Sequence, residues 1–399
     1  MRKFLLAGTS LVGVALAAGP ATAADGIKLS VGGFFKEAYM VVFDDDSDTE
    51  LGNEHNTDGF FNDAEVHFTG STVLDNGLEV GARIELEGEN DDDQIDEAWI
   101  YFAGGFGEVR ICSDDEALAN ACIVPPGGTG NFSAFSPNQW GANGSGLAAI
   151  FGPFSSNSVC TGVDDKGDAQ KIVYITPNFG GFQLTASYTP ESTAEDHVDG
   201  AGPHVGMPVH GVAQSRHNVS VYGTYSFEGD GWGLTAGLGG SWEGHVEEGG
   251  TGADLDEQDF YQAGINLTVG NFGIGVVGEY FNNVLSGESD TTRIDKDVWV
   301  VGIGASYALD AWTFGVQYSH REDDTDIDGI PTVDDFNLQQ DRIVGTINYA
   351  LGPGISIDGE LGYTWLDTDP EFEDAFSGAP DGLDDYQAFE IGVGTNITF

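Results

Sequence analysis

The chain has 399 residues, and 13 Lys and Arg against 66 Asp and Glu give it a formal net charge of −53. A protein this acidic repels nucleic-acid phosphates, so nucleic-acid binding is excluded. Hydrophobic residues make up 40% and aromatic residues 11% of the chain, which argues against disorder. Sixty glycines with three cysteines and three methionines suit many turns between strands better than a soluble α/β enzyme.

The first 23 residues have the organisation of a cleavable signal peptide. Arg2 and Lys3 form a basic start, residues 4–18 are mostly apolar, and Ala21 and Ala23 frame a small-x-small cleavage site. We expect export, with residues 1–23 removed and residues 24–399 forming one mature domain. No later stretch reaches the roughly 18 consecutive apolar residues of a membrane-spanning helix, so a chain that spans a membrane must do so as a barrel.

Beyond the signal, apolar and polar residues alternate with the period of two that is typical of β-strands. In residues 78–87, for example, Val80 and Ile84 alternate with Arg83 and Glu85. The pattern predicts about sixteen antiparallel strands of roughly ten residues each. They are expected to begin near Lys28, Asn62, Gly77, Gln94, Gly107, Gln170, Gly181, Arg216, Gly231, Glu257, Asn271, Asp297, Ala311, Gln339, Gly354 and Tyr386.

The connections between these strands alternate in length. Tight turns are expected at residues 104–107, 178–181, 228–231, 270–271 and 352–354. Between them lie longer acidic connections, at 44–61, 91–93, 113–169, 191–215, 244–256, 282–296, 322–338 and 367–385. Short turns on one side and long loops on the other indicate an all-β transmembrane barrel with short periplasmic turns and long extracellular loops. A soluble β-sandwich has no reason to separate its loops in this way.

Aromatic residues near the strand ends favour the barrel over the sandwich, although alternation alone fits both. Such rings suit the two interfacial girdles, where one side of a side chain is wet and the other dry. An even number of strands also closes a barrel without a free edge. The girdle candidates are Phe34, Phe35, Tyr39, Phe60, Phe61, Trp99, Tyr101, Trp232, Trp242, Tyr261, Trp299, Tyr307, Trp312, Tyr318, Tyr363, Trp365 and Phe399.

Three features resemble Gram-negative porins: the signal, the opening strand at residues 28–35 and the aromatic Phe399 at the end of an alternating strand. The segment from Thr176 to Leu184 is similar to the alphaproteobacterial (Rhodobacter-like) general porins. The resemblance covers the mature chain and implies a sixteen-stranded barrel in the outer membrane of a Gram-negative bacterium. It also implies a homotrimer, contact with outer-membrane lipid and lipopolysaccharide, a third loop folded into the pore, and reading of Phe399 by the barrel-assembly machinery.

Residues 113–169 form the third and longest loop, and they are therefore the candidate constriction. The loop opens with Asp114, Asp115 and Glu116. Basic residues on the predicted lumen phase of early strands would face it, and a wall of cations opposite carboxylates creates a transverse field. These basic residues are Lys28, Lys36, Arg83 and Arg110. The alternative is that these charges are simply solvated lumen residues.

Carboxylates outnumber bases on the predicted lumen phase, and the loops are acidic. This predicts a negative mouth that concentrates cations and a preference for cations over anions. Loop solvation, for example in a saline habitat, is the alternative explanation of the charge. The lumen candidates are Glu65, Glu85, Glu87, Glu97, Glu279, Asp358, Glu360 and Glu390.

One acidic run matches the spacing of a helix-loop-helix calcium site. Asp324, Asp326 and Asp328 stand at positions 1, 3 and 5, Gly329 at position 6 and Asp335 at position 12. No helical pattern flanks the run, Pro331 interrupts it, and position 12 holds the shorter Asp instead of Glu. Calcium is therefore a candidate ligand but not a required cofactor, and an ordinary solvated loop is the alternative.

Three cysteines in an exported protein allow at most one disulfide. All three lie in or beside the long loop, and Cys122 with Cys160 could fasten it, which would leave Cys112 at a strand end. Metal binding by the cysteines is not expected, because neither a CxxC motif nor clustered His accompanies them.

No catalytic motif is present: the eight histidines lack HExxH spacing, and there is no GxSxG elbow or phosphate loop. The sequence therefore predicts a non-enzymatic porin, a water-filled channel through which small hydrophilic solutes and ions, preferably cations, diffuse passively. The alternatives are a substrate-specific outer-membrane channel, an acidic calcium-binding surface adhesin and a barrel hydrolase. A specific sugar channel would carry aromatic residues inside, whereas most aromatics here fall on the lipid phase.

Overall fold

The computed structural model describes residues 26–44, 57–88, 95–135, 159–160, 169–191, 215–246, 254–283, 287–288, 293–328, 335–368 and 387–399. The expected signal peptide, residues 1–23, lies outside this range. The described part of the chain contains no helix long and apolar enough to cross a membrane.

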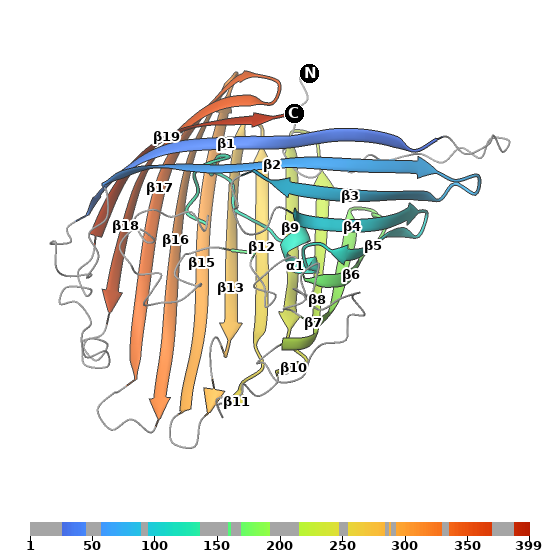
Figure 1. Ribbon diagram of the computed structural model, residues 1–399. Coiled ribbons are helices and arrows are strands. Elements are labelled where there is room, and N and C mark those ends of the chain that lie inside the picture. Colours follow the sequence, from blue (N-terminus) through green and yellow to red (C-terminus); the bar gives the residue numbers. More distant parts are fainter. Residues whose placement is uncertain are drawn as a thin grey trace.

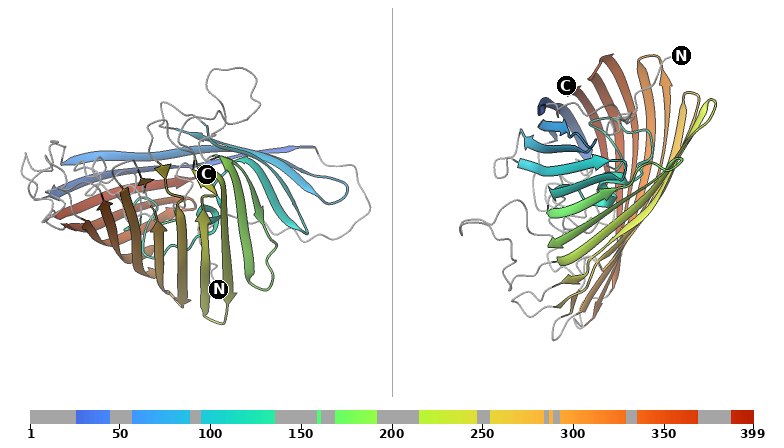
Figure 2. Two further views of the ribbon diagram at one scale, coloured as in Figure 1. Left: turned by 90° about the horizontal axis from the view of Figure 1, so that it is seen from below. Right: turned by 90° about the vertical axis from the view of Figure 1, so that its right-hand side faces the viewer.

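One antiparallel sheet organises the molecule, and it closes on itself (Figures 1 and 2). β1 pairs with β2 on one side and with β19 on the other. Nineteen strands are described, of which β10, β11 and β14 have two residues each and extend neighbouring strands, so sixteen strands form the ring. Closure leaves no free strand edge, which a membrane-spanning sheet requires.

The strands of the ring begin within four residues of the predicted positions, and several are longer than ten residues. The sixteen-strand prediction is therefore confirmed. The bounds are β1 Lys28–Asp44, β2 Asp58–Val73, β3 Glu79–Glu87, β4 Ile95–Gly104, β5 Gly107–Ser113, β6 Gln170–Ile175, β7 Phe182–Glu191, β8 Ser215–Glu228, β9 Trp232–Trp242, β10 His245–Val246, β11 Asp254–Leu255, β12 Asp259–Val269, β13 Phe272–Asn282, β14 Gly287–Glu288, β15 Arg293–Leu309, β16 Trp312–Asp328, β17 Phe336–Gly352, β18 Ile355–Thr368 and β19 Gln387–Thr398. A five-residue helix, α1 Ala117–Ala121, follows β5.

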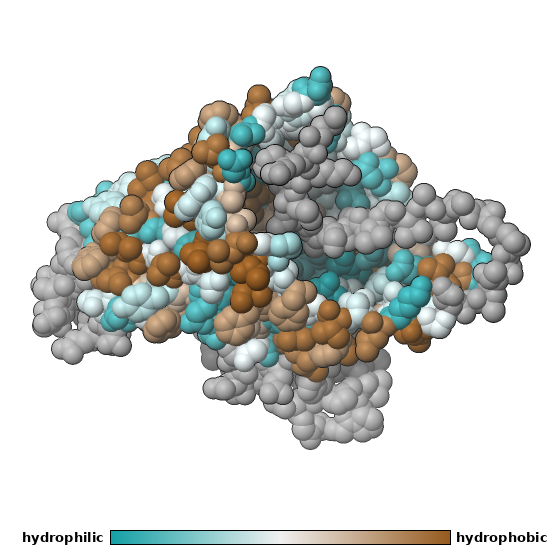
Figure 3. Space-filling model, turned by 90° about the horizontal axis from the view of Figure 1, so that it is seen from above, coloured by the Kyte–Doolittle hydropathy of each residue, from teal (hydrophilic) through white to brown (hydrophobic). Residues whose placement is uncertain are grey.

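Alternation along the strands places apolar side chains outside the ring and polar side chains inside it. On β7, Phe182 and Tyr188 are exposed, whereas Thr185, Ser187 and Thr189 are buried. A water-soluble sandwich would bury the apolar face instead, so this arrangement identifies the outer face as the lipid-facing one. In the space-filling view, apolar residues gather on the outside and hydrophilic residues are visible in the hollow that the strands enclose (Figure 3).

The tight turns depend on glycine where neighbouring strands approach closely. Gly107, which starts β5, has a φ of +110°, and a Cβ there would lie 2.2 Å from the carbonyl oxygen of Ile175. Only glycine adopts this conformation at such a distance without strain. The Gly-rich turns read from the sequence are therefore requirements of the strand connections.

Most of the aromatic residues expected in the girdles lie on the outer face, but four do not. Cross-strand register places Trp99 opposite Arg83 and Tyr101 opposite Arg110, on the inner face, because directly paired residues share one side of a sheet. Phe34 of β1 pairs with Glu65, and Phe61 of β2 pairs with Ala38, so both rings also point inward. The girdle prediction is wrong for these four residues, since periodicity near a strand end does not reveal its phase.

Candidate pore constriction

A long segment turns back into the barrel after β5. Its described parts are residues 114–135 and 159–160, and the first contains α1, which lies inside the ring of strands near β7, β8 and β9 (Figure 1). The Ala117 backbone N–H donates to Ser187 Oγ at 2.9 Å, and the Leu118 N–H donates to Ser220 Oγ at 3.0 Å. Polar side chains on the inner face of the wall therefore satisfy the start of a helix too short to cap itself.

A disulfide fastens the next part of the segment. Cys122 and Cys160 are bonded, and the Cys160 N–H donates to Glu279 Oε1 of β13 at 2.9 Å. Gln262 of β12 accepts the Ile123 N–H at 3.2 Å and donates to the same Glu279 oxygen at 2.9 Å. The pairing considered from the sequence is thus the one that the structure contains, and Cys112 stays a free thiol.

The rest of the described segment follows the wall around to β18 and β19. Gln317 donates to the Pro125 carbonyl oxygen at 2.9 Å, and Thr346 donates to the Gly127 carbonyl oxygen at 2.5 Å. Asn131 donates from its side chain to Asp358 Oδ1 at 3.0 Å and to the Thr395 carbonyl oxygen at 3.2 Å. The segment therefore lines the inner face of the wall, which is the place expected for a constriction loop.

Glycines on the wall make this close approach possible. A Cβ at Gly304 of β15 would lie 2.0 Å from the Pro126 carbonyl oxygen, and a Cβ at Gly315 of β16 would lie 2.0 Å from that of Gly127. These strand glycines are not turn residues. They leave room for the backbone of the loop, which is a recognised role of glycine inside strands.

The opposite part of the wall, formed by β1 to β5, carries paired charges. Lys36 Nζ lies 2.6 Å from Asp63 Oδ2, and Arg83 forms an ion pair with Glu85. Trp99 lies between two guanidinium groups, whose carbon atoms are 5.3 Å (Arg83) and 5.4 Å (Arg110) from its ring centroid. The indole face and the neighbouring carboxylates hold both arginines on the wall.

Among the described residues, carboxylates outnumber basic side chains on the inner phase of β1 to β5. Lys36, Arg83 and Arg110 each form an ion pair with a carboxylate in this region. The wall is therefore negative overall, and its bases stand among carboxylates instead of forming a separate wall of cations. The carboxylates include Asp63, Glu65, Glu79, Glu85, Glu87, Glu97 and Glu108, and the bases are Lys28, Lys36, Arg83 and Arg110.

The predicted constriction residues are only partly brought together. Arg110 Nε is 2.6 Å from Glu108 Oε1, and Arg110 Nη1 is 3.3 Å from Asp114 Oδ1, so loop and wall meet at the root of the loop. The Asp115 N–H donates to Glu97 Oε1 of β4 at 3.0 Å. These contacts hold the start of the loop against the neighbouring strands β4 and β5. The start of the loop therefore does not face Arg110 from the opposite side of the pore.

Two predicted constriction residues lie elsewhere. Glu116 is buried and accepts a 2.7 Å hydrogen bond from Ser241 of β9, so it holds the loop against the wall. Lys28 begins β1 in an exposed position. The expectation that loop carboxylates face a wall of bases is corrected in this respect, because a buried carboxylate needs hydrogen-bond partners, and Ser241 of the wall is one for Glu116.

Lys171 of β6 belongs to the same root cluster and was not singled out from the sequence. Its buried ammonium donates to the Asp114 carbonyl oxygen. Burial raises the pKa of the Asp114 carboxyl, and the neighbouring Arg110 and Lys171 act in the opposite direction. The two-residue alternation of β6 could have placed Lys171 on the inner face. Its contact with Asp114 depends on how the loop turns, which alternation does not reveal.

All eight carboxylates expected on the lumen phase lie on the inner face. On the far side of the ring, two of them share one arginine. Arg342 Nη2 lies 2.7 Å from Glu390 Oε2 and 3.4 Å from Glu360 Oε1, and all three side chains are buried. Buried charges need such partners, so this cluster is structural in character.

The residues of the candidate calcium loop lie on a strand. Residues 324–328 form the end of β16, where alternate side chains project from one face about 6.6 Å apart, given the strand rise of about 3.3 Å per residue. The Asp335 carboxylate accepts the Ile327 N–H at 3.0 Å. This backbone does not curve around an ion as a calcium loop does.

A closed antiparallel barrel with an apolar exterior, a charged interior and a long segment folded inside defines an outer-membrane channel. The family model of the Gram-negative porins matches residues 7–369. The chain therefore belongs to the Gram-negative porin family, and its location is the outer membrane. No curated protein matches it at the level of sequence.

Solved structures agree with this fold. The chain resembles a loop-deletion variant of OmpT, an outer membrane protein of Vibrio cholerae, with a TM-score of 0.58, 12% identity and coverage of 94% of this chain and 100% of that one. It resembles the anion-selective porin from Comamonas acidovorans with a TM-score of 0.55, 16% identity and coverage of 94% and 100%. Salmonella typhi OmpF in complex with daunomycin aligns with a TM-score of 0.54, 14% identity and coverage of 94% and 98%.

Proposed function

We propose that this protein is a general porin that lets small hydrophilic solutes and ions diffuse through a water-filled channel, prefers cations, and performs no catalysis. The observation that carries the proposal is the barrel with a charged inner wall and residues 114–135 folded against it. Family and fold both favour a channel over an enzyme.

The preference for cations rests on the sign of the interior charge. The inner phase of β1 to β5 has more carboxylates than bases, and the whole chain has a formal net charge of −53. A low-dielectric wall focuses this field and raises the local concentration of cations. Because one similar structure is an anion-selective porin, the fold alone does not set the sign. The side chains must do so.

Assembly as a homotrimer in contact with outer-membrane lipid and lipopolysaccharide is part of the proposal. So is recognition of Phe399 by the barrel-assembly machinery. The position of Phe399 supports this recognition, because its side chain is exposed directly after β19. Its backbone N–H donates to the Gly33 carbonyl oxygen of β1 at 3.0 Å, so it lies where β19 and β1 close the barrel.

Calcium binding by the acidic segment stays a prediction. The strand geometry around Asp324 and Asp326 favours weak association of ions with exposed carboxylates over a single tight site. An adhesin function would require the calcium-bound loops and no channel, so the conductance measurement below separates it from a porin.

The test is the reversal potential of the refolded full-length mature protein in a planar bilayer that separates two potassium chloride concentrations. We expect discrete conductance steps and a reversal potential of the sign that cation flow produces. An anion-selective potential would contradict the electrostatic part of the proposal alone. The absence of conductance from protein that is correctly folded by circular dichroism would contradict the channel itself.

A further inference from the structure

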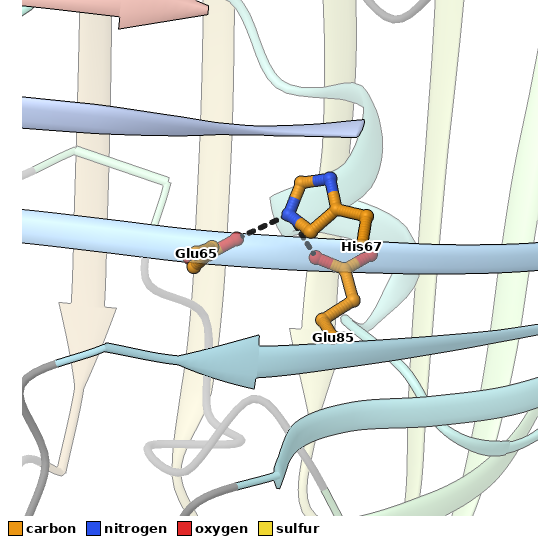
Figure 4. Close-up of side chains that lie close together, drawn as sticks. All are labelled: Glu65, His67 and Glu85. Carbon is orange, nitrogen blue, oxygen red and sulfur yellow. Dashed lines mark hydrogen bonds and ion pairs between the residues drawn. The ribbon is translucent and has the colours of Figure 1, made fainter. Parts of the chain in front are cut away.

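Three potential metal ligands converge on the inner face of β2 and β3. His67 Nε2 lies 2.6 Å from Glu65 Oε2 and 3.0 Å from Glu85 Oε2 (Figure 4). One ligand atom from each residue lies within 4.8 Å of the others. Figure 4 shows the two carboxylates approaching the same ring nitrogen from two different strands.

The register of the two strands creates this convergence. His67 is directly opposite Glu85 in the β2–β3 pair, and Glu65 precedes His67 by two residues, so all three side chains project from the same face. The cluster therefore rests on backbone hydrogen bonds within the sheet and not on a loop. Metal sites built on such rigid elements hold their ligands more precisely.

The donor set selects a class of metal. One imidazole nitrogen and two carboxylate oxygens suit zinc and neighbouring divalent transition metals, whereas calcium and magnesium prefer oxygen alone. The side chain of Glu85 is 6% exposed, while those of His67 and Glu65 are 19% and 18% exposed. The cluster is thus set into the wall but partly exposed.

Arg83 orders the cluster when no metal is bound. Its Nη2 lies 3.0 Å from His67 Nδ1, and its guanidinium also pairs with Glu85 Oε1. Because a guanidinium only donates, His67 Nδ1 accepts, and the imidazole proton resides on Nε2, between the two carboxylates. Glu85 Oε2 remains directed at His67 and is not taken up by this pair with Arg83.

From this geometry we propose that Glu65, His67 and Glu85 bind a divalent transition metal ion on the inner wall of the barrel. The ion takes the position of the Nε2 proton, which moves to Nδ1 through solvent, and Arg83 leaves Nδ1 while it keeps its pair with Glu85. A bound ion adds positive charge to the negative wall, so metal binding lowers the cation preference of the channel.

Isothermal titration of zinc chloride into the detergent-solubilised full-length protein tests this proposal without any channel assay. We expect one site per chain above the weak background of surface carboxylates. His67→Ala removes it, and Glu65→Gln and Glu85→Gln each weaken it at least about tenfold, as is typical when a metal site loses a supporting group. His320→Ala is the matched control, because His320 of β16 has Asp341 at 2.8 Å but faces outward.

Two outcomes overturn the proposal. One is zinc binding that is the same in His67→Ala and the wild type, and the other is a loss of zinc binding in His320→Ala as large as that in His67→Ala. Should His67→Ala fail to form conducting channels, the two isosteric Glu→Gln variants decide. A second measurement is the reversal potential with and without micromolar zinc, which should shift in the wild type and not in Glu85→Gln. Channels that conduct but bind no zinc contradict only the metal site and leave the porin function intact.

Discussion

At the scale of single residues, the negative inner wall results from carboxylates that exceed the available bases. Lys36, Arg83 and Arg110 are each paired with a carboxylate, so their charges are largely neutralised locally. Glu87 lies on the same inner phase, opposite Glu65 in the register. Charges of this kind set the field that a permeating ion meets.

Neutralising Glu79 and Glu87 tests that assignment. We expect the double variant Glu79→Gln/Glu87→Gln to conduct but to lose part of its cation preference, because each carboxylate close to the ion path contributes about 1 kcal/mol or less in a high-dielectric channel. We predict that the cation-to-anion permeability ratio, obtained from reversal potentials, falls by up to a few fold.

The matched control for this variant is Asp230→Asn/Asp367→Asn. It removes two charges as well, but from an exposed turn and from an exposed position on β18. Equal loss of selectivity in both double variants would mean that total charge, and not the inner wall, determines selectivity.

At the scale of elements, the loop and the wall fit each other through small residues. Residues 114–135 reach hydrogen-bond partners on the wall from β7 to β19, and the wall provides glycines where the backbone of the loop touches it. The alternation of the strands was predictable because a pleated strand has a fixed period of two. The path of the loop was not, because it depends on contacts between residues far apart in the chain.

Gly304→Ala tests the packing of loop against wall. The added methyl group would lie 2.0 Å from the Pro126 carbonyl oxygen, so the loop must move, at a cost of roughly 1–3 kcal/mol typical of overpacking. We expect an altered single-channel conductance and faster cleavage of the loop by added protease, with the barrel preserved.

Gly278→Ala on the neighbouring β13 is the control, because a Cβ at that position meets no atom within 4 Å. Both variants replace a strand glycine with alanine, so they share any effect on strand propensity. If the two behave alike, the packing of the loop against Gly304 does not govern its position.

At the scale of the whole molecule, the net charge of −53 acts at long range and is subject to screening. The Debye length falls from about 30 Å at 0.01 M salt to about 3 Å at 1 M salt. We expect the permeability ratio, measured at a constant tenfold gradient, to fall towards unity as the mean salt concentration rises. A ratio independent of salt would instead indicate selection by close contact at the constriction.

The amino-acid sequence alone is enough to infer the barrel, its sixteen strands, the inward phase of the carboxylates and the long loop after β5. These features follow from local rules, namely the two-residue period of strands, turn glycines and the solvent preference of each side chain. Cross-strand register and the path of the loop came only from the tertiary structure. They decided that Arg83 faces Trp99, that Glu116 is buried, and that His67 meets Glu65 and Glu85. The reason is physical: residues far apart in sequence become neighbours only once each strand pair has adopted its register and the loop its path inside the ring.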